Sequence, residues 1–174
     1  MFLRVMNGIV SHASNYVFKI GEVNVSEKWN INATTSEQQG GFNFTNEENI
    51  LRWMIRGDTL YDVIIPIDAE IIQVKNKNTP NGVFRTNKII VTNPREITDD
   101  MCLNFLKISQ IPLKTYYQVL AIMAGKGFSK TCEKILFEKI NKENVKECIE
   151  EYLNFDFYKD HGIYKSILRE LYEI

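Results

Sequence analysis

The stretch GGFNFTNEENILRWMIRGDTLYDVIIPIDAE, residues 40–70, carries the most ordered pattern in the chain. Phe42 and Phe44 alternate with polar residues, so they share one face of a short strand over Gly41–Phe44. Residues Leu60–Pro66 form a nearly continuous apolar run, which is typical of a strand covered on both faces. Pro66 ends that strand because proline has no backbone N–H to donate.

A helix is expected between these two strands. Thr45 precedes Glu48 by three residues, and this is the spacing of a capping box at a helix start. The apolar residues that follow recur at helical spacing, and Gly57 is placed to end the helix. The stretch therefore predicts a strand–helix–strand unit.

Working outward, alternating apolar residues and turn signals predict further strands on both sides. Residues 30–41 are polar and indicate an exposed loop, whereas the sequence NKNTPNG, residues 76–82, indicates a turn. Asn93-Pro94 is expected to end the last strand. The additional predicted strands are Phe2–Met6, Tyr16–Ile20, Glu70–Val74 and Val83–Thr92.

From Thr98 onward the apolar period becomes helical. Thr98 is a suitable N-cap, and Asp99 and Asp100 supply the acidic first turn that the helix dipole favours. The sequence predicts an α+β protein, with a mixed or antiparallel strand-rich domain over residues 1–97 and a helical region, a helix pair or bundle, packed on it over 98–174. The helices are expected near 98–109, 113–124, 129–140, 142–154 and 160–173.

Composition narrows the function classes. The 174 residues include 21 Lys+Arg and 22 Asp+Glu, and this net charge of −1 disfavours general nucleic-acid binding. The chain has no apolar run of membrane-spanning length, so no membrane association is expected. Three widely spaced cysteines predict buried, reduced thiols and a cytoplasmic protein. The oligomeric state stays open.

Catalytic and metal-binding signatures are missing from the sequence. His12 and His161 are the only histidines, and no spacing of histidines or cysteines is typical of a metal site. Neither a nucleophile elbow nor a phosphate-binding glycine loop is present. The acids of the strand-rich half do not select a catalytic pair by their spacing.

Basic residues offer a candidate binding patch. Two arginines stand four apart on the predicted helix, and further basic residues follow the NTPNG turn. Such a patch would suit an acidic partner surface or a phosphate. The alternative is that these groups are solvated and pair with nearby acids. The proposed partner-binding residues are Arg52, Arg56, Arg85 and Lys88, with the loop near Thr34–Gln39 as a further contact.

Five segments of residues 1–98 follow one another in a distinctive order: GGFNFT at 40–45, ILRW at 50–53, DTLYDV at 58–63, IPIDAE at 65–70 and FRTNKII at 84–90. Their order and spacing resemble a family of small uncharacterised proteins from phages, prophages and giant viruses. In some giant-virus members this module precedes ankyrin-type repeats. The helical half is similar to a degenerate ankyrin-type or other helix-pair repeat, with a plain bundle as the alternative.

The order of elements also resembles the ADP-ribosyltransferase fold. That resemblance implies that Arg4 holds the phosphates or ribose of NAD and that Phe44 stacks on the nicotinamide. Glu70 or Glu96 would then have to act as the catalytic carboxylate. The late strand has Arg85-Thr86-Asn87-Lys88 where the family carries its glutamate, so the fold is expected more than the activity.

Two functional hypotheses follow. In the first, the chain is a phage- or mobile-element-type protein of the bacterial cytoplasm that binds and inhibits a host protein without catalysis, cofactor or metal. An anti-CRISPR-like role against a CRISPR effector complex is the form of this hypothesis that we favour. In the second, it is an ADP-ribosyltransferase that modifies a host protein with NAD.

Overall fold

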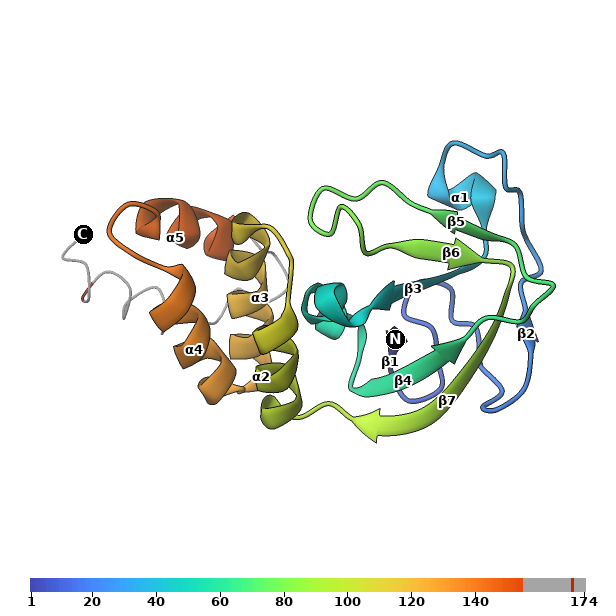
Figure 1. Ribbon diagram of the computed structural model, residues 1–174, viewed down its shortest axis with the longest axis horizontal. Coiled ribbons are helices and arrows are strands. Elements are labelled where there is room, and N and C mark those ends of the chain that lie inside the picture. Colours follow the sequence, from blue (N-terminus) through green and yellow to red (C-terminus); the bar gives the residue numbers. More distant parts are fainter. Residues whose placement is uncertain (155–169, 171–174) are drawn as a thin grey trace. The chain divides into compact units, whose positions relative to one another are not determined.

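The computed structural model describes residues 1–154 and residue 170. The chain divides into two compact units, Met1–Ile97 and Thr98–Ile174, here called the N-terminal unit and the helical unit. All seven strands lie in the first unit and most of the helices in the second, so the predicted α+β class is confirmed (Figure 1). The predicted helix at 160–173 lies outside the described residues.

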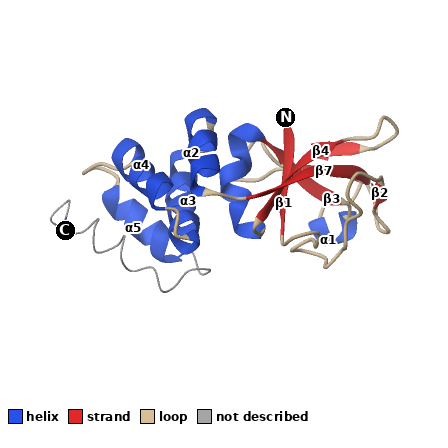
Figure 2. Ribbon diagram, turned by 90° about the horizontal axis from the view of Figure 1, so that it is seen from below, coloured by secondary structure: helices blue, strands red, loops and turns tan. Residues whose placement is uncertain are grey.

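The N-terminal unit contains one seven-stranded sheet in the order β2-β7-β4-β1-β3-β6-β5, with every neighbouring pair antiparallel. β1 therefore lies at the centre, between β4 and β3 (Figure 2). The strands are β1 Phe2–Met6, β2 Asn24–Val25, β3 Phe42–Asn46, β4 Thr59–Ile64, β5 Ile71–Gln73, β6 Phe84–Thr86 and β7 Lys88–Glu96.

The sheet curls strongly, and the connection between β6 and β7 shows why. The single residue Asn87 separates these two strands, although they hold the sixth and second positions in the sheet. The two ends of the sheet must therefore approach each other around a common interior (Figure 1). That interior is filled by Met6, Phe18, Phe42, Phe44, Tyr61, Val63, Ile89 and Val91, all of them buried.

The predicted helix after β3 exists, but its start and type differ from the prediction. It is a 3-10 helix, η1, over Glu47–Arg56, with Asn46 as its N-cap and no side-chain capping bond. The expected capping box does not form because the Thr45 hydroxyl donates to the backbone oxygen of Gly82 instead. Thr45 is the fourth residue of β3, so its side chain serves the sheet and not the helix.

Two strand predictions are also corrected. Tyr16–Ile20 is not a strand, since only Val17 forms a β-bridge there, with Val10. Asn93-Pro94 does not end the last strand, because β7 continues to Glu96. The register with β4 shifts at this point and Asn93 has a φ of 52°, so a β-bulge accommodates the proline.

The polar segment 30–41 is more ordered than a free loop. A short helix, α1, spans Ser36–Gln39, with the Thr35 hydroxyl accepting from the backbone N–H of Gln38 at 3.4 Å. Gly40 follows with a φ of 68°, and a Cβ built there would lie 2.0 Å from the backbone oxygen of Lys28. Only glycine fits this close approach of two backbones.

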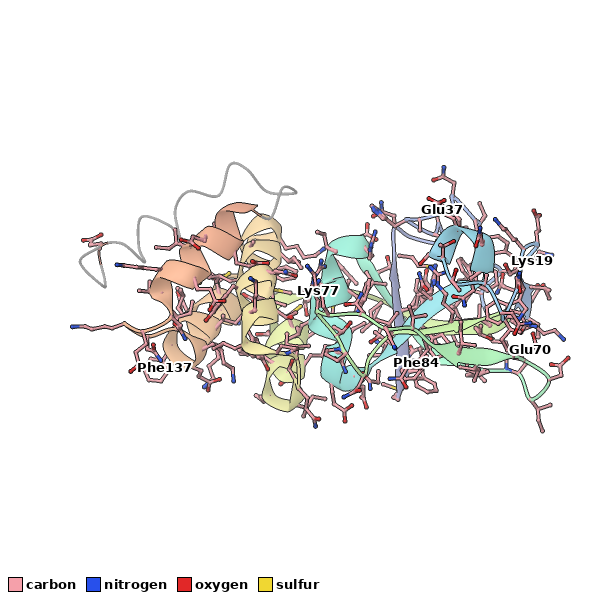
Figure 3. The ribbon with its side chains drawn as sticks, turned by 90° about the horizontal axis from the view of Figure 1, so that it is seen from above. Lys19, Glu37, Glu70, Lys77, Phe84 and Phe137 are labelled. Carbon is pink, nitrogen blue, oxygen red and sulfur yellow. The ribbon has the colours of Figure 1, made fainter. Side chains whose placement is uncertain are left out.

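The helical unit has four described helices, close to those predicted over residues 98–154. A cross-helix cap joins two of them: the Asp99 carboxylate accepts from the backbone N–H groups of Lys130 and Thr131 at 2.9 and 3.0 Å. Phe137 on α4 points outward and is 86% exposed (Figure 3). The helices are α2 Asp99–Ile108, α3 Leu113–Lys126, α4 Ser129–Lys139 and α5 Val145–Asn154.

The cysteines of this unit, Cys102, Cys132 and Cys148, are buried, and none of the three forms a disulfide. Burial raises the pKa of Cys102 and of Cys148 to about 12, so these thiols stay protonated and act as small core residues. Among the described helices, none combines the length and the apolar character needed to cross a bilayer.

Candidate functional site

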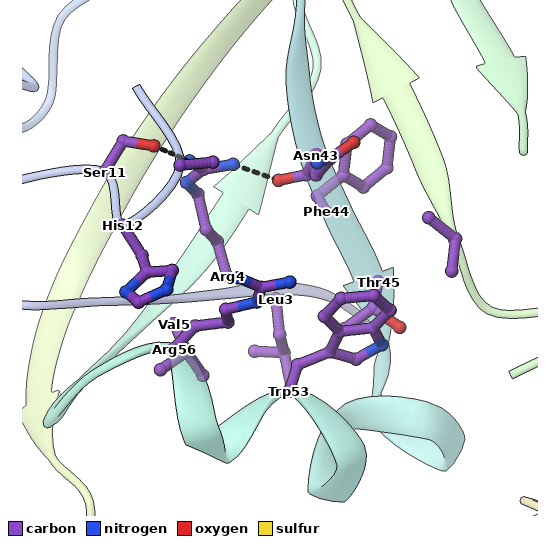
Figure 4. A pocket seen from close by; sticks show the side chains of 12 residues that line it. Leu3, Arg4, Val5, Ser11, His12, Asn43, Phe44, Thr45, Trp53 and Arg56 are labelled. Atoms are coloured by element: carbon purple, nitrogen blue, oxygen red, sulfur yellow. Dashed lines mark hydrogen bonds between the residues drawn. The ribbon is translucent and has the colours of Figure 1, made fainter. Parts of the chain in front are cut away.

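A pocket opens in the N-terminal unit between β1, the loop that follows it, β3 and η1 (Figure 4). Its volume is about 80 Å³. That is enough for several water molecules or one small polyatomic group. The lining residues are Leu3, Arg4, Val5, Ser11, His12, Ala13, Asn43, Phe44, Thr45, Trp53, Arg56 and Val83.

Arg4 is the central cation of the pocket. Its guanidinium donates to the backbone oxygen of Asn43 and, at 2.9 Å, to the hydroxyl of Ser11 (Figure 4). Its Cζ lies 4.8 Å from the centre of the Phe18 ring. These contacts hold the side chain in place but leave its Nε buried without a hydrogen-bond partner.

The pKa of Arg4 is lowered to about 10, first by burial and second by the charge of Arg56. Burial likewise lowers the pKa of Arg56. Both shifts mean that the folded protein disfavours these positive charges as they stand. No ion pair to either guanidinium forms within residues 1–154.

Trp53 forms the aromatic wall beside Arg56. The Cζ of Arg56 lies 5.8 Å from the centre of the indole ring, and that of Arg52 lies 6.0 Å from it. The indole Nε1 is buried and has no hydrogen-bond partner. A buried polar group without a partner is unfavourable, so this indole N–H is a donor that an added acceptor could satisfy.

The electrostatics of the lining are one-sided. It contains two guanidinium groups and the imidazole of His12, but none of its twelve residues carries a carboxylate. Guanidinium groups match the oxygens of phosphate and carboxylate groups geometrically as well as by charge. The pocket is therefore a candidate site for an oxyanion.

The structure brings together only part of the set implied by the ADP-ribosyltransferase resemblance. Arg4 and Phe44 line the same pocket. Glu70 lies elsewhere, just before β5 (Figure 3). Its carboxylate accepts a hydrogen bond from the indole N–H of Trp29. Glu96 is exposed at the end of β7, opposite Thr59. Neither carboxylate lines the pocket.

The predicted basic patch divides among separate contacts. Of its four residues only Arg56 lines the pocket, while Arg52 lies on the same helix. Arg85 on β6 donates to the Asn43 side chain at 2.6 Å and to the backbone of α1. Lys88 forms an ion pair with an exposed aspartate, Asp68. Arg85 and Lys88 thus stabilise the unit itself.

Ser11, His12 and Trp53 line the pocket, although no functional role was predicted for them from the sequence. Their convergence depends on the antiparallel pairing of β1 with β3, which places the loop after β1 opposite η1. The one local signal was a tryptophan flanked by arginines at positions 52 and 56.

Within the described residues, no group of three or more His, Cys, Asp or Glu side chains is arranged to hold a metal ion. Comparisons of the chain with protein-family models, with curated proteins and with solved structures gave no match.

Proposed function

We propose that the chain is a binding protein without catalysis of its own, and that its N-terminal unit receives an anionic group of its partner in the pocket of Arg4 and Arg56. One observation carries this proposal: two guanidinium groups with lowered pKa values line a pocket that contains no carboxylate. An oxyanion between them would supply the missing countercharge.

The partner that we propose is a bacterial host protein, with a CRISPR effector complex as the favoured example. This part of the proposal rests on the resemblance to phage and prophage proteins. The pocket adds the chemistry of recognition, since an acidic or phosphorylated side chain of such a protein would present the required group. Affinity capture from host lysate would have to return a stoichiometric partner, and Arg56→Gln should weaken its retention.

An ADP-ribosyltransferase activity is the second candidate, favoured by the joint presence of Arg4 and Phe44 in the pocket. Such chemistry needs a carboxylate to orient the ribose and stabilise an oxocarbenium-like centre. Glu70 and Glu96 lie outside the lining, which supports binding over catalysis. Incubation with labelled NAD and a host lysate tests this candidate, and transfer of label that requires Arg4 would favour it over our proposal.

Anion binding itself is measurable through the indole N–H of Trp53. The chain has two tryptophans, so ¹H–¹⁵N spectra contain two indole signals, which Trp29→Phe assigns. Titration with inorganic phosphate and with acetate should shift the Trp53 signal, and the shift should shrink in Arg56→Gln. Lys88→Gln is the matched control, because Lys88 pairs with Asp68 and does not line the pocket. An unchanged Trp53 signal with both anions at tens of millimolar would rule the site out.

A further inference from the structure

We infer that the group received in this pocket is a phosphate monoester in its dianionic form, and that Trp53 and Arg4 donate hydrogen bonds to it. The inference rests on the proposed function and specifies its ligand class. Its observations are the charge of the pocket, the elements from which its donors extend and its size.

The positive charge of the pocket favours a ligand that carries more than one negative charge. Arg4 and Arg56 contribute two permanent positive charges, and the lining offers no carboxylate to either. A carboxylate ligand would neutralise only one of them. A phosphate monoester carries a charge of about −1.5 to −2 near neutral pH, because its second pKa is about 6, and it therefore matches both.

The donors approach from different elements. Arg4 extends from β1, whereas Arg56 and Trp53 extend from η1, with His12 on the loop between β1 and β2 (Figure 4). Two donors, the Nε of Arg4 and the Nε1 of Trp53, are buried without partners. The three terminal oxygens of a phosphate point in three directions and can accept from such a set, while the two oxygens of a carboxylate lie in one plane.

The size of the pocket limits what enters it. A volume of about 80 Å³ admits the phosphate group and leaves most of the molecule that carries it outside. Two sources share this chemistry: a sugar phosphate or mononucleotide, and a phosphorylated side chain of a protein. The partly exposed Trp53 ring beside the pocket offers a flat contact to either one.

Calorimetric titration of the full chain at pH 7.5 tests the ligand class with four small probes. Ribose 5-phosphate and N-acetyl-phosphoserine amide represent the two sources of a monoester. Dimethyl phosphate has the same central group with a single charge, and N-acetyl-glutamate amide is the carboxylate control. We expect at least one monoester to bind at least tenfold more tightly than both controls, and the stronger of the two monoesters identifies the source.

The pH dependence provides an independent readout. Affinity for the monoester should increase between pH 5.5 and 7.5 as the second proton leaves the phosphate. Arg4 and Arg56 stay charged throughout this range, since their lowered pKa values remain far above it. Methyl sulfate is a monoanion at every pH in this range, so any pH dependence that comes from the protein appears in its titration and can be subtracted.

Two substitutions separate charge from hydrogen bonding. Arg56→Gln should abolish the preference for a dianion over a monoanion. Trp53→Phe removes the indole N–H donor and keeps an aromatic ring at this position, so it should weaken binding of the monoester severalfold while the preference for a dianion remains. Circular dichroism of each variant, with Lys88→Gln as control, checks that the fold persists.

The outcomes distinguish the two proposals. Equal binding of monoester, dimethyl phosphate and the glutamate derivative would refute the dianion assignment and leave the anion pocket standing. A monoester affinity that does not change with pH after subtraction would refute it as well. Absence of binding for all four probes would overturn the pocket and the ligand class together.

Discussion

The cap that Asp99 provides to α4 gives a quantitative test of how the helical unit is held together. Phe128, at the N-cap position of α4, has no side-chain capping bond. The Asp99 carboxylate on α2 supplies it instead, accepting from two backbone N–H groups and, at 2.6 Å, from the hydroxyl of Thr131. Thr131 is fully buried, so solvent cannot replace these bonds at its side chain.

Asp99→Ala should therefore lower the free energy of unfolding of this unit by about 2–3 kcal/mol. Loss of an N-cap side chain costs roughly 0.5–2 kcal/mol, and a hydrogen bond to a charged group contributes about 1.5–3 kcal/mol. The three bonds share one carboxylate, and the Thr131 hydroxyl keeps a contact to the Asp99 backbone oxygen at 3.2 Å. For these two reasons the contributions of the cap and of the charged hydrogen bonds are not simply added.

Asp100→Ala is the matched control. Asp100 occupies the same first turn of α2 and loses the same interaction with the helix dipole. Its ion pair with Lys130 is solvent-exposed, with side chains 73% and 62% accessible, so its removal should cost much less than the removal of Asp99.

Thiol accessibility in increasing urea is a specific assay, because all three cysteines lie in the helical unit and are buried there. The midpoint of thiol exposure should fall clearly for Asp99→Ala and little for Asp100→Ala, with Asp99→Asn between them. A difference below about 0.5 kcal/mol between the two alanine variants would contradict the cross-helix cap, since that is the usual range of surface substitutions.

Three further outcomes are expected. A hydrogen bond from an arginine of β7 is the main cause of the lowered pKa of Asp62. Asp62 therefore adds stability above pH ~4, and this stability is lost as the pH falls through its folded pKa. Asp62→Asn should lower the free energy of unfolding by roughly 1 kcal/mol at pH 7, and urea titrations from pH 7 to 2.5 should show the difference between the two proteins disappear. Because their pKa values are raised to about 12, Cys102 and Cys148 should react with iodoacetamide at pH 8 at least 100-fold more slowly in the native protein than in urea. Mass spectrometry measures the labelling, and native protein that is labelled at these cysteines within minutes would disprove the prediction. Gly40→Ala should lower the thermal stability clearly more than Gly127→Ala. Both glycines have a positive φ, which costs an alanine about 1–2 kcal/mol, but of the two only Gly40 faces a backbone oxygen. Equal losses of stability in thermal unfolding would contradict this steric argument.

The local sequence pattern predicted a helix or strand well where the side chains that form the pattern interact only with their own segment or with the core. The apolar run of β4 and the Thr98 cap of α2 are such cases, and the Thr98 hydroxyl does accept from the backbone N–H of Met101 at 3.3 Å. Thr45 has the same local signature, yet its hydroxyl bonds to Gly82, 37 residues away. The local sequence does not contain that partner, so the competition between cap and sheet was not predictable from it.

The candidate site was predictable only in part for a similar reason. Arg4 and Phe44 were expected in one pocket through a resemblance, and the structure places both in its lining. The acids expected with them point to other partners, and Trp53 joins the site because η1 turns its side chain toward β1 and β3. The meeting of these side chains depends on sheet register, which no single segment specifies.

Asn87 links the two ends of the sheet in a way that bears on insertions and deletions. It is the only residue between β6, which pairs with β3 and β5, and β7, which pairs with β4 and β2. Its side chain accepts from the backbone N–H of Glu70 at 2.9 Å, and its backbone oxygen accepts from Ser26. Since side chains alternate between the two faces of a strand, removing this residue would force either β6 or β7 to exchange its inward and outward faces. The corner at Asn87 should therefore tolerate substitution far better than any change in length.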